Sequence, residues 1–242
     1  MLLKAILFCC IFLIGAGSGQ SPKDEPVPHV STFRASVHME RPYPDDPVRI
    51  YGLFEGSSDI ARFTHDPIVA NKSEHPYRLW DKVPFQAGED WLQNLVIVVK
   101  NLSNKEIVAG SVNIRFPETG KGTPEDAFVG QTITLGQRPE YALHATRDGH
   151  RLNIGPTEPI SVKPGEGMKF AVSPYSSEIR RQIESKRAFS DIGACAIMLG
   201  PFYFSDGTRW ASYSGFQKPD PSAPGKYARI TAEEFKKTNG SH

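Results

Sequence analysis

The stretch that decides the fold is LQNLVIVVKNLSNKEIVAGSVNIRFP, residues 92–117. Residues 95–99 are apolar at every position, which is typical of an interior strand covered on both faces. Asn and Ser residues follow at 101–104, and their side chains favour a turn because they bond to nearby backbone. Apolar and polar residues then alternate from 107 to 116, which indicates a strand with one wet face. The stretch therefore predicts two strands joined by a short polar turn, the second ended by Pro117.

Period-two patterns predict further strands along the chain of 242 residues. The 21 Gly and 20 Pro favour a turn-rich β protein over a helical one. Residues 71–91 read instead as a long irregular connection that is rich in aromatic side chains. Strands are expected at residues 33–39, 48–54, 133–135, 141–154 (a hairpin), 160–162 and 168–172, and a long apolar strand is expected at residues 194–204.

Residues 97–117, IVVKNLSNKEIVAGSVNIRFP, resemble the central strand pair of immunoglobulin-like modules in secreted bacterial proteins. In that family an [IV]-x-V-x-N-x-S-x-K-x-I run precedes a strand that ends in an aromatic residue. Residues 202–210, FYFSDGTRW, are similar to segments of uncharacterised secreted β-proteins. The resemblance implies a mostly β fold, an antiparallel immunoglobulin-like β-sandwich. It transfers no functional residue.

Two helices are expected outside the N-terminal leader. The first, residues 176–187, would be capped by Ser176 or Ser177 and would cross over the end of the sandwich. The second is a short C-terminal helix after Thr231, which forms the T-x-x-E pattern of a capping box with Glu234.

Residues 1–20 have the pattern of a secretory signal peptide, although a retained anchor is the alternative. Lys4 precedes an apolar run at residues 5–14, and small residues follow at the cleavage site. The run is too short to span a bilayer, so no stable membrane span is expected after cleavage. The sequence thus predicts a secreted or periplasmic protein. The signal peptide is followed by a disordered leader (21–29), a β-sandwich domain (30–216) and a C-terminal tail (217–242). Residues 30–91 are either peripheral strands and a loop or part of the same sandwich.

Cleavage would remove two of the three cysteines and leave Cys195 among apolar neighbours. We therefore expect a buried thiol and no intrachain disulfide. Three N-x-[ST] sequons are present, at Asn71, Asn101 and Asn239. The central turn would be exposed if Asn101 were glycosylated.

Charge and motifs exclude several classes of function. The formal net charge is +1, with 28 basic and 27 acidic residues, so no nucleic-acid partner is expected. G-x-S-x-G, H-E-x-x-H, a phosphate-binding loop and a dinucleotide fingerprint are all absent from the sequence. The sequence therefore favours a non-catalytic exported protein without a cofactor or catalytic residue. It would bind a protein, peptide or glycan in the cell envelope or outside, or serve a structural role.

Three alternatives remain open, and two of them concern specific side chains. A carbohydrate-binding module would use a platform of exposed, coplanar aromatic rings. The alternative is that these rings cap one end of the sandwich as satellite core. The rings are Tyr77, Trp80, Phe85, Trp91 and Trp210. A metal site would use His144, Asp148 and His150, which otherwise lie on a solvated hairpin. A hydrolase with an unrecognised site would need carboxylates or histidines that converge in a deep pocket.

Overall fold

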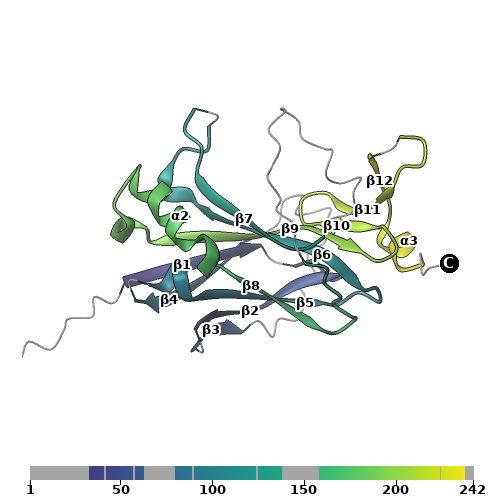
Figure 1. Ribbon diagram of the computed structural model, residues 1–242, viewed down its shortest axis with the longest axis horizontal. Helices are drawn as coiled ribbons and strands as arrows, with labels where there is room; N and C mark the ends of the chain where they lie inside the picture. Colours follow the sequence, from purple (N-terminus) through teal and green to yellow (C-terminus); the bar gives the residue numbers. More distant parts are fainter. Residues whose placement is uncertain are drawn as a thin grey trace, which may run out of the picture. The chain divides into compact units, whose positions relative to one another are not determined.

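The computed structural model describes residues 33–40, 42–56, 58–62, 80–88, 90–123, 125–137, 158–223 and 225–237. These residues belong to one compact unit, Ser31–His242. They form twelve strands, three α-helices and two 3₁₀ turns, so the protein is mostly β, as predicted (Figure 1). Within the described part no helix is long and apolar enough to cross a membrane.

The larger sheet has eight strands and is mixed. Its central strand is β9, which pairs along one edge with β6; β7 lies beyond β6. Along the other edge, the first half of β9 pairs parallel with β1 and the second half pairs antiparallel with β10. The eight strands are β1 (Phe33–Glu40), β4 (Trp80–Ala87), β6 (Ile107–Phe116), β7 (Val129–Gly136), β9 (Ala194–Phe204), β10 (Arg209–Ala211), β11 (Gly215–Pro219) and β12 (Tyr227–Arg229).

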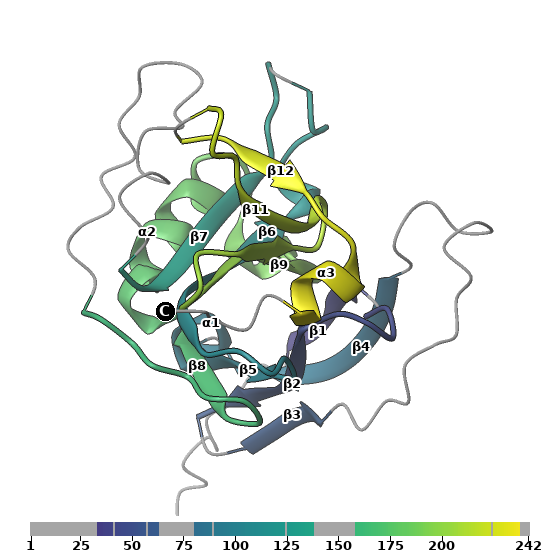
Figure 2. The same cartoon turned by 90° about the vertical axis from the view of Figure 1, so that its right-hand side faces the viewer.

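The smaller sheet is antiparallel and has the order β3-β2-β5-β8. Figure 2 shows these strands on one side of the unit and β6, β7, β9 and β11 on the other. The smaller sheet is formed by β2 (Val48–Glu55), β3 (Ser58–Arg62), β5 (Leu95–Asn101) and β8 (Gly167–Ala171).

The central stretch forms the two predicted strands, but they lie in different sheets. β5 is an interior strand of the smaller sheet, and β6 pairs with β7 and β9 in the larger one. Asn101 holds the connection between them, since its side chain is fully buried. Its Nδ2 donates to the carbonyls of Lys105 (2.7 Å) and Val162 (2.9 Å), and its Oδ1 accepts from the backbone N–H of Ser103 (3.0 Å).

The two sheets share one hydrophobic core. Phe170 on β8 meets Phe202 on β9 edge to face, with ring centroids 6.3 Å apart. Phe202 lies opposite Gly110 on β6. A Cβ at Gly110 would stand 2.5 Å from two ring carbons of Phe202, so the ring occupies the space that a side chain there would need.

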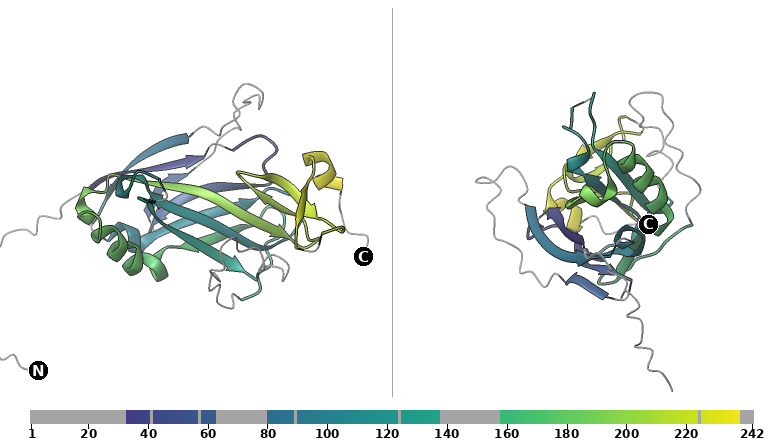
Figure 3. Two further views of the ribbon diagram at one scale, coloured as in Figure 1. Left: turned by 90° about the horizontal axis from the view of Figure 1, so that it is seen from above. Right: turned by 90° about the vertical axis from the view of Figure 1, so that its left-hand side faces the viewer.

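Helix α2 (Ser173–Glu184) and the C-terminal helix α3 (Ala232–Lys237) lie at opposite ends of the strands (Figure 3). α2 contacts β7 and α1 (Trp91–Asn94). It begins three residues before the predicted start, so Ser176 is inside the helix, where its hydroxyl donates to the carbonyl of Ser173 instead of capping. The 3₁₀ turns are Pro117–Thr119 and Phe189–Asp191.

The C-terminal segment joins the larger sheet through β11, β12 and α3 (Ala232–Lys237). The predicted capping box is confirmed, because the Glu234 carboxylate accepts from the Thr231 N–H (2.8 Å) and the Thr231 hydroxyl accepts from the Glu234 N–H (3.1 Å). Phe235 of this helix packs against Phe204 and Phe216, at centroid distances of 4.9 and 4.8 Å.

Residues 80–87 were expected to be irregular, and this expectation is wrong. They form β4, which pairs antiparallel with β1 along its whole length. β4 is at the end of the larger sheet, where Pro84 is tolerated because an edge strand leaves N–H groups unused.

Candidate ligand-binding groove

The aromatic residues singled out in the sequence do not gather at one surface. Trp91 and Trp210 are core residues, with 2% and 1% of their surface exposed. Trp91 stacks on Phe189 at 6.1 Å, and Trp210 packs against Phe202 at 6.3 Å. These two rings are therefore unavailable for stacking on a sugar. Of the other three, Trp80 and Phe85 are placed on β4 by their backbone, and Tyr77 lies outside the described residues.

The groups considered for metal binding and catalysis give no site in the described part of the chain. His144, Asp148 and His150 lie outside it. Within it, no cluster of three or more His, Cys, Asp or Glu residues could hold a metal ion. Cys195 is buried as expected, and burial raises the pKa of its thiol to about 12, so the reactive thiolate is suppressed.

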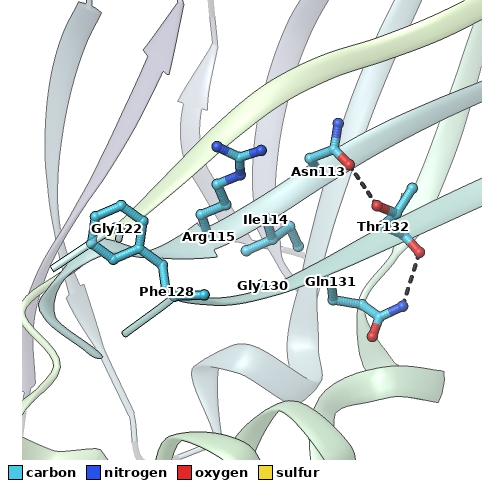
Figure 4. Close-up of a pocket in the computed structure, with 9 residues that line it drawn as sticks. Asn113, Ile114, Arg115, Gly122, Phe128, Gly130, Gln131 and Thr132 are labelled. Carbon is cyan, nitrogen blue, oxygen red and sulfur yellow. Dashed lines mark hydrogen bonds between the residues drawn. The ribbon is translucent and has the colours of Figure 1, made fainter. Parts of the chain in front are cut away.

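A groove of about 380 Å³ lies on the face of β6 and β7 that points away from the core (Figure 4). Arg115 on β6 lies opposite Gly130 on β7, and Asn113 lies opposite Thr132. Gly130 has no side chain, which leaves a gap between Phe128 and Thr132. A Cβ at Gly130 would be 3.3 Å from Cγ of Arg115, so the stem of the arginine already lies against this glycine.

The loop before β7 fixes the position of the Phe128 ring. A Cβ at Gly122 would stand 2.7 Å from Cε2 of Phe128, so the ring rests directly on this glycine, whose φ of +74° is left-handed. Asp126 closes the loop by accepting from the Lys121 N–H (3.0 Å). Lys186, just after α2, donates to the Ala127 carbonyl (2.6 Å). The ring is thus held in place while 37% of its surface stays exposed.

The polar side chains of the groove are also ordered. The Thr132 hydroxyl donates to Oδ1 of Asn113 (2.6 Å), and Nε2 of Gln131 donates to the Thr132 carbonyl (2.9 Å). Figure 4 shows Arg115 between the Phe128 ring and the Asn113–Thr132 pair. Oδ1 of Asn113 already accepts from Thr132, so the two N–H groups on Nδ2 of Asn113 are the part of this amide that can donate to a ligand.

The groove is electropositive. Arg115 is exposed, and no hydrogen bond or ion pair joins it to another residue of the described ranges. No carboxylate is among the described residues that line the groove. Of the nearby loop acids, Glu118 accepts from the Gly193 N–H (2.7 Å), Asp126 accepts from the Lys121 backbone N–H and pairs with Lys186, and Glu125 is exposed. A guanidinium, an exposed ring and amide N–H groups suit a polar ligand with an anionic group.

Sequence reasoning placed Asn113 and Arg115 on the wet face of their strand but did not assign them a role. Phe128 was missed altogether. One signal was present, because Phe128, Gly130 and Thr132 alternate with the buried Val129. An aromatic and a glycine on the polar face of a strand indicate a hollow beside a ring.

Comparison of the chain with protein-family models, with curated proteins and with solved structures finds no match in any of the three.

Proposed function

We propose that this protein is an exported, non-catalytic binding protein of the immunoglobulin-like sandwich type. Its ligand is a saccharide that binds in the groove between Phe128 and Thr132. Export is supported by the leader at residues 1–20, and the sandwich type by the strand pattern at residues 97–117 and by two sheets with a shared core.

The observation that carries the proposal is the pairing of Phe128 with Arg115 across Gly130. Both side chains are exposed, and the loop fixes the ring before any ligand arrives. A preformed ring lowers the entropy cost of binding, and an apolar ring next to polar donors matches a sugar, which has an apolar face and a hydroxyl rim. The platform differs from the one that the sequence offered as an alternative, since it uses Phe128 instead of Trp91 and Trp210.

The test is isothermal titration of the full chain with oligosaccharides of cellulose, chitin and polygalacturonate, together with an acidic peptide. We expect one of the oligosaccharides to bind. Phe128→Ala should weaken its binding about tenfold, because an aromatic contact contributes about 1 kcal/mol beyond the area that it buries. Thermal melting of each variant verifies that it is folded.

The matched control is Tyr213→Ala. Tyr213 is 68% exposed in the turn between β10 and β11 and does not line the groove. Its removal should leave the dissociation constant unchanged. Equal losses in both variants, or binding of the peptide alone, would contradict the proposal.

A further inference from the structure

The register of the larger sheet places other cations in line with Arg115. Arg115 is paired with Ala196 on β9, Ala196 with His38 on β1, and His38 with Lys82 on β4. Directly opposite residues point to the same face of a sheet. Neighbouring pairs confirm which face this is, because Ile114, Ile197 and Met39 in the adjacent register row are all buried. Arg115, His38 and Lys82 therefore share the outer face with the groove; we call these three residues the basic row.

The basic row has a defined length. One strand lies between Arg115 and His38, and Lys82 is on the strand next to His38. Strands are about 4.8 Å apart, so Arg115 and Lys82 are separated by about 14 Å at the backbone. The residue between Arg115 and His38 is Ala196, which is itself buried (8% exposed) and has no long side chain to interrupt a ligand that spans its neighbours. Arg115 and Lys82 are exposed, and His38 is half-buried.

Few carboxylates lie beside the basic row in the described part of the chain. His38 is held by a 3.3 Å contact between its Nε2 and the Ser36 hydroxyl. Glu40, two residues further along β1, is half-buried and has an interaction of its own. The row itself contains Arg115, His38 and Lys82 and no carboxylate, so its charge is positive although the chain as a whole is nearly neutral.

We propose that the ligand is a linear acidic polysaccharide that runs from the groove across β9 and β1 to Lys82. This inference rests on the proposed function and extends it. One uronate carboxylate would bind the fork of Arg115, whose geometry suits bidentate carboxylate recognition. The Phe128 ring would cover one sugar, and carboxylates further along the chain would lie over His38 and Lys82. A nucleic acid is disfavoured, because among the described residues Phe128 is the one exposed ring that lines the groove, and the basic row adds none.

The experiment compares hexagalacturonate with its fully methyl-esterified form, which has the same sugars without the charges. The full chain should bind the acid at least tenfold more tightly, and its affinity should fall as NaCl rises from 50 to 300 mM. Arg115→Gln should weaken binding of both the hexamer and digalacturonate about tenfold or more, because hydrogen bonds to charged groups are the strong ones.

Lys82→Gln distinguishes the basic row from the groove. It should weaken hexamer binding about two- to fivefold, as for an exposed ion pair, and should not affect digalacturonate, which is too short to reach β4. The matched control is Lys169→Gln on β8 of the other sheet, an exposed cation whose loss should change neither affinity. Melting temperatures verify that both variants are folded.

The two proposals fail differently. If the ester binds as tightly as the acid and Phe128→Ala still weakens binding, the saccharide groove stands and the acidic polysaccharide is wrong. If single-stranded DNA of the same charge binds more tightly than hexagalacturonate, the assigned class of ligand is wrong. If neither Phe128→Ala nor Arg115→Gln alters any saccharide affinity, the groove itself is refuted.

Discussion

Replacing Gly110 by alanine should destabilise the protein, because the added methyl group enters space that the Phe202 ring already fills. The new Cβ would lie 2.5 Å from two ring carbons and 3.4 Å from the Cε methyl of Met168. Phe202 is fully buried and is packed against Phe170 and Trp210, so its ring has no free direction in which to move. The strain must therefore be absorbed by the core between the sheets.

The expected size follows from measured effects of overpacking. An extra methylene in a well-packed core lowers the unfolding free energy by about 1–3 kcal/mol. Replacement of glycine by alanine raises it by about 0.4–1 kcal/mol, because alanine restricts the unfolded chain. The net loss for Gly110→Ala should be about 1–2 kcal/mol. For a domain of this size each kcal/mol lowers the melting temperature by about 2–4 °C, so a decrease of about 2–8 °C is expected.

The assay is urea denaturation followed by tryptophan fluorescence, with thermal melting as a second measurement. The matched control is Gly167→Ala on β8. A Cβ there would meet the Val99 carbonyl oxygen at 3.6 Å and a Val98 methyl at 3.7 Å, which are ordinary contacts. The control should be as stable as the natural chain or slightly more stable. The reasoning is refuted if both variants have the same unfolding free energy, or if Gly110→Ala is the more stable one.

Three further results are expected. Lys105→Met should lower the unfolding free energy by about 3 kcal/mol in urea, because it leaves Asp206, whose side chain is only 12% exposed, without its ion-pair partner; adding Asp206→Asn should recover part of this loss. Phe235→Ala should cost about 3 kcal/mol or more and release α3 to proteolysis, whereas an unchanged cleavage pattern would contradict its packing between β9 and β11. Native Cys195 should resist iodoacetamide at pH 9 and react once unfolded. Burial raises the pKa of this thiol from its ordinary value of 9.0 to about 12, so its contribution to stability is present below pH 9 and is lost as pH rises towards 12. The Cys195→Ala variant should lack this part of the alkaline decline.

Local patterns were sufficient to predict most strands of the described part. Residues 194–204 were expected as one long apolar strand and form β9 with the same bounds. The strand expected at residues 33–39, which forms β1, and the capping box at Thr231 were also correct, because period-two alternation and capping depend on neighbours in sequence.

The assignment of strands to sheets was beyond the sequence pattern. A short polar turn such as residues 102–106 can join two strands of one sheet or strands of two sheets. In this protein β5 and β6 pair with different strands, and the buried hydrogen bonds of Asn101 hold the connection between them. β4 was missed because its alternation contains Pro84 and charged residues, which an edge strand accepts.

The groove was unpredictable for a related reason. Arg115 and Gly130 are close because β6 and β7 pair, and Lys82 joins the same face only through β9 and β1. Such a set is defined by register across strands that are far apart in sequence. For Trp91 and Trp210 the sequence left a surface platform and core packing open, and the structure places both in the core.

The buried amide of Asn101 has a consequence for how the protein can be produced. Asn101-Leu102-Ser103 is an acceptor sequence for N-glycosylation, yet both N–H groups of this amide are used inside the fold. A host that transfers oligosaccharides to nascent chains would place a large hydrophilic group on an atom with no exposed surface, and those molecules could not close the connection between the sheets. Expression in such cells should split the product into a folded, unmodified fraction and a glycosylated, misfolded one, so a host without this pathway is the better choice.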